Sequence, residues 1–162
     1  MTGRVLVLGL GNPDRGDDGI GAAVVQRLAG RVPGDVRLAI VGGDLLSAID
    51  DWSGCDAVIC IDAAARLTAP GRIHRIDLGT ETLPPDFACA SSHEFGLAES
   101  IALARALDVA PAQIIIYAVE GGCFSTGAAL TADVAAACGR VADLVLDEVV
   151  RLRQQPGQAA HG

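Results

Sequence analysis

Apolar residues occur along this chain in short runs that predict the strands of a sheet. The runs 4–10, 36–41 and 57–61 are continuous, which is typical of strands buried on both faces of a parallel sheet. Residues 114–119 form a further, β-branched run of this kind. Residues 72–77 instead mix apolar and polar positions, which favours a more exposed and antiparallel edge strand.

Apolar residues at helical spacing predict three helices, over residues 20–28, 97–107 and 132–153. The short stretch 45–49 can form a crossover helix, and Thr131 is a suitable N-cap for the last helix. Strands alternating with helices predict an α/β protein. We expect a three-layer αβα sandwich around a mostly parallel, twisted five-stranded sheet, with a site at the carboxyl ends of the strands.

The length and composition fit one domain. A chain of 162 residues, 51% of them hydrophobic, is long enough to bury a single core. The sequence contains neither a repeat nor an interdomain linker. We therefore expect one domain over residues 1–153, followed by a flexible tail over residues 154–162, where Gln, Gly and Pro are frequent.

The charge excludes several classes of function. Twelve basic and 20 acidic residues give a net charge of -8, which repels nucleic acid and anionic membrane surfaces. All the basic residues are arginines, so a phosphate-loop lysine, a Schiff-base lysine and a lysine general base are excluded. The five cysteines form no C-x-x-C pair, which disfavours a disulfide framework or a zinc cluster.

The first apolar run is too short for a membrane span or for the apolar region of a signal peptide, because polar residues follow it at 12–15. We expect a cytoplasmic protein with no membrane partner.

The glycine-rich turn at residues 9–21 resembles a dinucleotide-binding loop only superficially. The third glycine of G-x-G-x-x-G would fall on Asp14, and Asp17 and Asp18 would repel a pyrophosphate. Adjacent acids suit a cation better. Either one can instead cap the helix that begins near Gly19, which leaves the other available.

Two further residues converge on the same edge of the predicted sheet. Asp62 follows the third apolar run, and His93 precedes a helix. Each has an ordinary alternative, as a solvated loop acid and as an isolated histidine. Together with Asp18, however, they supply two carboxylates and an imidazole, which suit a borderline divalent metal such as nickel or zinc. Asp17 would then support the ligands or cap the helix.

The remaining candidates for chemistry are weaker. Ser92 adjoins His93, and the side chains of neighbouring residues usually diverge, so a serine nucleophile is disfavoured. We expect Cys123 to be a buried structural thiol, Glu120 a solvated or hydrogen-bonded loop acid, and Asp44 a helix cap or a residue facing the cleft. The sequence identifies no catalytic base or nucleophile.

Three motifs together carry a resemblance to a known family. They are Gly9-x-Gly11-Asn12-x-x-Arg15-Gly16-Asp17-Asp18-Gly19-x-Gly21, Ile61-Asp62-Ala63 and Ser92-His93-x-x-Gly96-Leu97. Over residues 5–149 the chain resembles the maturation endopeptidases of [NiFe] hydrogenases. The chain departs from many members in having Val41, and not an acid, before Gly42-Gly43, and from some members in having Asp18 in place of Glu.

This resemblance implies a cytoplasmic endopeptidase that removes a C-terminal extension from the hydrogenase large-subunit precursor after nickel insertion. It also implies that Asp18, Asp62 and His93 bind nickel carried by that precursor, with zinc as a possible substitute. A nickel-dependent binding or chaperone module of hydrogenase assembly, without proteolysis, is the main alternative. A nucleotide-binding protein is a further alternative, which the acidic turn disfavours.

Overall fold

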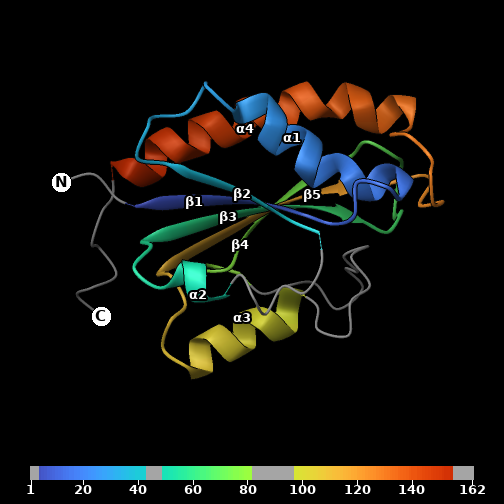
Figure 1. Ribbon diagram of the computed structural model, residues 1–162. Coiled ribbons are helices and arrows are strands. Elements are labelled where there is room, and N and C mark those ends of the chain that lie inside the picture. Colours follow the sequence, from blue (N-terminus) through green and yellow to red (C-terminus); the bar gives the residue numbers. More distant parts are fainter. Residues whose placement is uncertain (1–3, 43–48, 82–96, 155–162) are drawn as a thin grey trace.

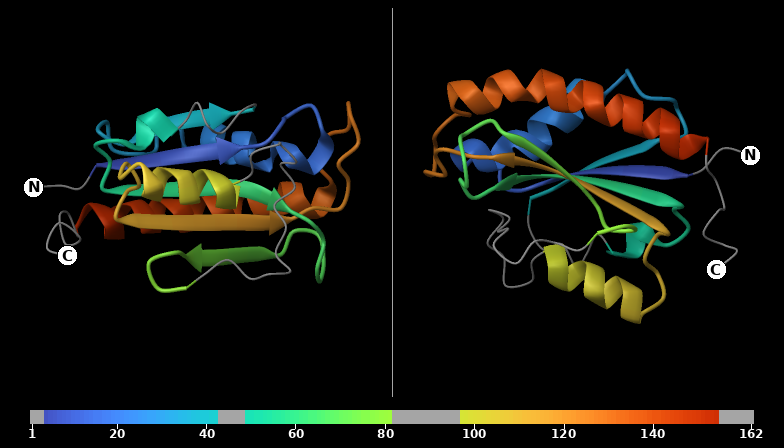
Figure 2. Two further views of the ribbon diagram at one scale, coloured as in Figure 1. Left: turned by 90° about the horizontal axis from the view of Figure 1, so that it is seen from below. Right: turned by 180° about the vertical axis from the view of Figure 1, so that it is seen from behind.

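The protein is built around a twisted five-stranded sheet, described by a computed structural model for residues 4–42, 49–81 and 97–154 (Figure 1). The strand order is β2-β1-β3-β5-β4, and all neighbours are parallel except β4 and β5. Figure 2 shows β4 running opposite to β5 at one edge. The strands are β1 (Val5–Leu10), β2 (Arg37–Val41), β3 (Ala57–Ala64), β4 (Ile73–Asp77) and β5 (Gln113–Glu120).

Helices cover both faces of this sheet (Figures 1 and 2). One face packs against α1 (Ile20–Leu28) and α4 (Ala132–Arg153), and the other against α2 (Ile49–Trp52) and α3 (Leu97–Ala106). A 3-10 turn, η1 (Gly16–Gly19), precedes α1. The predicted αβα sandwich with a mostly parallel sheet is therefore confirmed. None of the helices in these described ranges has the length and apolarity of a membrane span.

Several predicted elements are confirmed and two are corrected. The helices at 20–28 and 132–153 have the predicted bounds, and the edge strand at 72–77 is antiparallel as expected. The strand predicted at 57–61 continues to Ala64. The strand predicted at 36–41 as buried is instead an edge strand, in which Ile40 is 44% exposed. Of the helix predicted at 45–49, only Ile49 lies within the described residues, and it begins α2.

Close approach of α1 to the sheet determines where η1 lies. A Cβ atom on Gly21 would lie 2.6 Å from the carbonyl oxygens of Ile61 and Leu10, and one on Gly9 would lie 2.4 Å from the carbonyl oxygen of Gly21. Only glycine fits such contacts without displacing backbone. The start of α1 therefore lies directly on β1 and β3, which holds η1 against the carboxyl end of the sheet.

A buried polar cluster joins α4 to strands β4 and β5. The Glu148 carboxylate is almost fully buried and accepts hydrogen bonds from Tyr117 Oη at 2.6 Å and Arg75 Nε at 2.7 Å. Arg151, one helical turn along α4, also donates to it. These donors offset the desolvation of the charge, so the cluster explains how a glutamate is accommodated against the sheet.

Candidate functional site

The carboxyl ends of β1, β3 and β5 form the edge at which the site was predicted. Asp62 lies within β3, in register with Ala118 of β5, and its side chain is fully buried. Its carboxylate accepts a hydrogen bond of 2.8 Å from the backbone amide of Ala63. The alternative of a solvated loop acid is therefore wrong, because the strand continues past Asp62 and buries it.

Asp18 lies in η1 and carries an unsatisfied oxygen. Its side chain is 1% exposed, and Oδ2 accepts a hydrogen bond of 2.8 Å from the backbone amide of Asn12. Oδ1 is buried and has no hydrogen-bond partner among the residues that the structure describes. Such atoms are rare because desolvation is not compensated. No described residue donates to this oxygen, and η1 contacts β3, the strand of Asp62.

Gly11 makes room for this carboxylate. Gly11 has a φ of 113°, and a Cβ atom there would lie 2.6 Å from Asp18 Oδ1 and 2.3 Å from the Asp18 carbonyl oxygen. A side chain at position 11 is therefore excluded by both backbone strain and contact. The glycine-rich turn accommodates an acid, and this agrees with the cation interpretation of its sequence.

Asp17 has a different role from its neighbour. Its buried carboxylate accepts hydrogen bonds from the backbone amides of Gly122 at 2.7 Å, Cys123 at 3.1 Å and Thr131 at 2.7 Å. The expectation that Asp17 or Asp18 caps α1 is wrong, because Gly19 is the N-cap residue and no side chain caps this helix. Thr131 precedes α4 as predicted, but its hydroxyl donates to Asp17 and makes no capping bond.

Glu120 is hydrogen-bonded, as one of the two expectations stated, but it ends β5 at the same edge and lies in neither a loop nor solvent. Its side chain is fully buried, and Oε1 accepts hydrogen bonds from the backbone amides of Leu67, Thr68 and Ala69. Oε2 lies 2.6 Å from His74 Nε2. Burial by itself would raise the pKa of Glu120, but these amides and His74 outweigh it and hold the pKa at about 2. The sequence signal for this position is the alternation of side chains along a strand. Glu120 is two residues beyond Ala118, which pairs with Asp62, so Glu120 and Asp62 lie on the same face of the sheet.

Cys123 and Cys60 differ in burial and in the pKa of their thiols. Cys123, which we expected to be buried, is partly exposed, and a hydrogen bond with Ser125 lowers the pKa of its thiol. Cys60 in β3 is buried, and desolvation together with the charge of Asp62 raises its pKa to about 12. All the cysteines in the described ranges are free thiols, as expected from the sequence.

The structure describes two of the three predicted metal ligands, Asp18 and Asp62. Asp18 and Asp62 are buried at the same edge of the sheet, whereas His93, Ser92 and Asp44 lie outside the described residues. Within the described residues, no three His, Cys, Asp or Glu side chains form a group that could hold a metal ion. The contribution of His93 stays a prediction.

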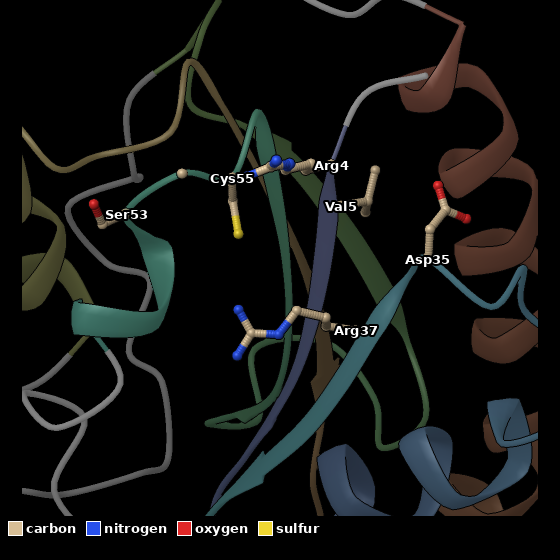
Figure 3. Close-up of a pocket in the computed structure, with 7 residues that line it drawn as sticks. Arg4, Val5, Asp35, Arg37, Ser53 and Cys55 are labelled. Carbon is tan, nitrogen blue, oxygen red and sulfur yellow. The ribbon is translucent and has the colours of Figure 1, made fainter. Parts of the chain in front are cut away.

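A pocket of about 390 Å³ lies at the other end of the sheet (Figure 3). It is lined by residues that begin β1 and β2 and precede β3, among them Arg4, Arg37 and Cys55. Figure 3 shows Arg37 extending from β2 toward Cys55. Because the amino ends of the strands form this pocket, it is separate from the edge that carries Asp18 and Asp62.

Comparison with known proteins supplies the family. The family model described as hydrogenase maturation protease matches residues 23–148. The chain belongs to this family. The matched range includes Asp62 and His93 and begins after Asp18. No curated protein matches the chain. Membership in this family confirms the resemblance that the three motifs indicated. It also confirms the prediction that the protein is a peptidase.

Solved structures of maturation proteases share its fold. The hydrogenase maturating endopeptidase HybD of E. coli is 25% identical, with a TM-score of 0.76 over 91% of this chain and 93% of that one. A hydrogenase 2 maturation peptidase from a Thaumarchaeota archaeon is 28% identical, with a TM-score of 0.69 over 90% and 97%. The [NiFe] hydrogenase maturation protease HybD of Thermococcus kodakarensis, at 24% identity, has the same fold, with a TM-score of 0.77 over 90% and 99%.

Proposed function

We propose that this maturation protease removes the C-terminal propeptide from the nickel-loaded large-subunit precursor of a [NiFe] hydrogenase, in the cytoplasm. The observation that carries the proposal is the buried Asp18 carboxylate. Its Oδ1 has no hydrogen-bond partner within residues 4–42, 49–81 and 97–154, and it lies at the edge where Asp62 is also buried. In this proposal, a metal carried by the substrate supplies the cation that binds this oxygen.

Nickel is part of the substrate in this proposal and is not a resident cofactor. Asp18, Asp62 and His93 would bind it while the precursor still holds it. Carboxylate oxygens and an imidazole form a donor set that suits nickel, and zinc could take its place in the same donors. The unsatisfied oxygen of Asp18 supports this fit, because binding a cation removes its desolvation cost.

The chemistry is hydrolysis of a peptide bond next to the bound metal. A divalent ion supplies polarisation of the scissile carbonyl or of a water molecule. The chain itself orients the substrate by fixing the two carboxylates. Asp62 is held by its position in β3, and Asp18 by the Asn12 amide and by the anchoring of its neighbour Asp17. This rigidity favours one geometry of the substrate over others.

Dependence on nickel would make cleavage a checkpoint. A precursor without nickel lacks the cation that Asp18, Asp62 and His93 bind, so its propeptide is not brought to the cleavage position. The protease then discriminates strongly between loaded and nickel-free precursors, because the carboxylates of Asp18 and Asp62 bind no cation when the nickel-free precursor binds. The protease would thus act only after metal insertion.

The test is mass spectrometry of a nickel-loaded large-subunit precursor incubated with wild type, Asp18→Asn, Asp62→Asn and His93→Gln. Asp14→Asn is a matched control, because Asp14 is an exposed acid in the same glycine-rich turn. Wild type and the control should release one discrete C-terminal peptide, and the three variants should do so at least about 100-fold more slowly. Folding of each protein is checked by circular dichroism.

Two results would contradict the proposal. Cleavage by Asp18→Asn at the wild-type rate would exclude Asp18 as a ligand. Failure of folded wild type to cut any nickel-loaded precursor that it binds would exclude the protease reaction, and would favour the binding or chaperone module considered from the sequence.

A further inference from the structure

β2 forms one edge of the sheet, opposite to the edge formed by β4 (Figure 2). Among the described strands it pairs with β1 alone. The backbone amide of Gly11 donates to the carbonyl oxygen of Val41 at 3.1 Å, so the backbone groups of Val41 face β1. Because these groups alternate in direction along a strand, those of Leu38 and Ile40 point outward, away from the sheet.

No feature of β2 itself blocks the addition of a further strand. Its pairing with β1 is continuous from Arg37 to Val41, so it contains no bulge. It contains no proline, Arg37 at its start is its one charged residue, and Ile40 is exposed. The opposite edge strand, β4, instead carries two charged residues and a histidine in five positions. Charges, prolines and bulges are the devices that protect an edge from pairing, and β2 is poor in them.

The carboxyl end of β2 lies against the turn that holds Asp18. Gly42 follows β2 and is exposed, and a Cβ atom there would lie 3.6 Å from the carbonyl oxygen of Gly11. Gly11 in turn lies so close to Asp18 that a side chain on it would contact Oδ1. Since neighbouring strands are 4.7–4.9 Å apart, a peptide on the outer edge of β2 passes within about 10 Å of Gly11. This edge is therefore continuous with the candidate metal-binding site.

We propose that the C-terminal propeptide of the precursor binds as an additional strand on the outer edge of β2, antiparallel to it. This inference rests on the proposed function, because it takes the propeptide as the segment that is removed. The propeptide follows the scissile bond, which lies at the metal-binding edge. Its residues therefore run from the carboxyl end of β2 toward the amino end. Recognition by strand addition gains affinity from main-chain hydrogen bonds.

The length of β2 limits how much of the propeptide can pair. Its five residues span about 17 Å at about 3.3 Å per residue, so about five propeptide residues lie along it. Main-chain bonds to Leu38 and Ile40 tolerate different sequences, whereas the exposed side chain of Ile40 favours an apolar residue opposite to it. Nickel then selects the loaded precursor, and β2 aligns the chain beyond the scissile bond.

A second copy of this chain is the competing occupant of the edge. Two β2 strands can pair about a twofold axis, as in many dimers. Each copy carries a net charge of -8, however, and this charge opposes self-association. The propeptide is favoured because the edge leads directly to the site at which its scissile bond is proposed to bind.

The first experiment is a proline scan of the propeptide within the nickel-loaded precursor, cleaved by the wild-type protease. The scan begins at the third residue after the scissile bond. In an added strand, only alternate residues direct their amides toward β2, and proline has no amide to donate. We expect proline at those positions to raise KM by about tenfold or more, and at the positions between them by less than about threefold. The value of kcat should stay within about twofold throughout.

The second experiment places proline in the protease and compares Ile40→Pro with Gly34→Pro. Proline at position 40 removes an outward amide and keeps the bonds between β2 and β1. Gly34 is the control, because it follows Pro33 in a turn closed by the Val36 amide and has open space around it. We expect KM of Ile40→Pro to rise by about 3- to 10-fold at unchanged kcat, and both constants of Gly34→Pro to stay at wild-type values.

The outcomes separate this inference from the proposed function. A proline scan without a period of two, or a wild-type KM for folded Ile40→Pro, would overturn the inference while cleavage by wild type upholds the proposed function. The scan alone decides if Ile40→Pro does not fold, because it leaves the protease unchanged. A wild-type dimer in light scattering that Ile40→Pro dissociates without a change in KM would assign the edge to a second copy and overturn the inference. If wild type does not cleave the loaded precursor, both fail.

Discussion

Asp17 and Thr131 are joined by hydrogen bonds across 114 positions of the chain. The Asp17 carboxylate accepts from the Thr131 backbone amide at 2.7 Å and from its hydroxyl at 2.9 Å. Since the same carboxylate holds Gly122 and Cys123, it ties the turn before α1 to the loop between β5 and α4. Figure 1 shows these two loops at the same end of the sheet. This tie fixes the position of the adjacent Asp18.

Loss of this tie should destabilise the protein. In Asp17→Ala, the buried amides that Asp17 binds lose their acceptor, and each unsatisfied group costs roughly 1–3 kcal/mol. We expect the free energy of unfolding in urea to fall by at least about 3 kcal/mol. Asp14→Ala, at an exposed acid of the same turn, should change it by less than about 0.5 kcal/mol. Equal effects of the two substitutions would refute the anchoring role.

Asp18→Asn should leave stability intact, unlike Asp17→Asn. The amide oxygen of Asn can still accept the hydrogen bond from Asn12. The substitution also removes a buried charge whose second oxygen has no hydrogen-bond partner in the part of the chain that the structure describes. We expect unfolding free energies within about 1 kcal/mol of wild type for Asp18→Asn, and a clear loss for Asp17→Asn. If calorimetry shows Asp18→Asn to be the less stable variant, Asp18 has a structural and not a ligand role.

Ionisation of Glu120 should make the free energy of unfolding depend on pH in the acidic range. Its pKa is lowered from 4.5 to about 2 in the folded protein, so the charged form contributes stability that is fully present above about pH 4.5. That contribution is lost as the pH falls toward 2. The difference in unfolding free energy between wild type and Glu120→Gln should therefore be larger at pH 7 than at pH 3. A difference that does not change with pH would show that the ionised carboxylate is not what stabilises the loop.

Gly21 should not tolerate a side chain. Alanine there would place Cβ 2.6 Å from backbone atoms of both β1 and β3, which forces α1 away from the sheet. Overpacking of this kind costs about 1–3 kcal/mol or more, and displacement of η1 would slow precursor cleavage as well. Gly34→Ala is the control, because nothing lies within 4 Å of that position. Comparable thermal midpoints for the two variants would contradict the close seating of α1.

The fold was predictable because its dominant patterns are local. Buried strands such as β5 read as continuous β-branched runs, and α4 keeps its helical spacing from Ala132 to Arg153. The burial of β2 was mispredicted because an apolar sequence does not reveal strand order, and β2 lies at an edge where Ile40 is exposed. Position within a sheet depends on partners that the local pattern does not specify.

The candidate site was predictable only in part. The acidic turn and the acid of β3 were identified from motif and topology, and both acids are buried at the expected edge. The separate roles of Asp17 and Asp18 were not predictable, because the donors that bind Asp17 come from residues 122–131. The partnership of Glu120 with His74 depends in the same way on an antiparallel strand pairing across 46 positions.

The central claim is that substrate-borne nickel licenses cleavage through the carboxylates of Asp18 and Asp62. The most direct measurement is the rate of propeptide release from the same large-subunit precursor with and without nickel, using wild-type protease and mass spectrometry. We predict release from the loaded precursor, and a rate at least about 100-fold lower from the nickel-free precursor. Equal rates for the two precursors would contradict the account.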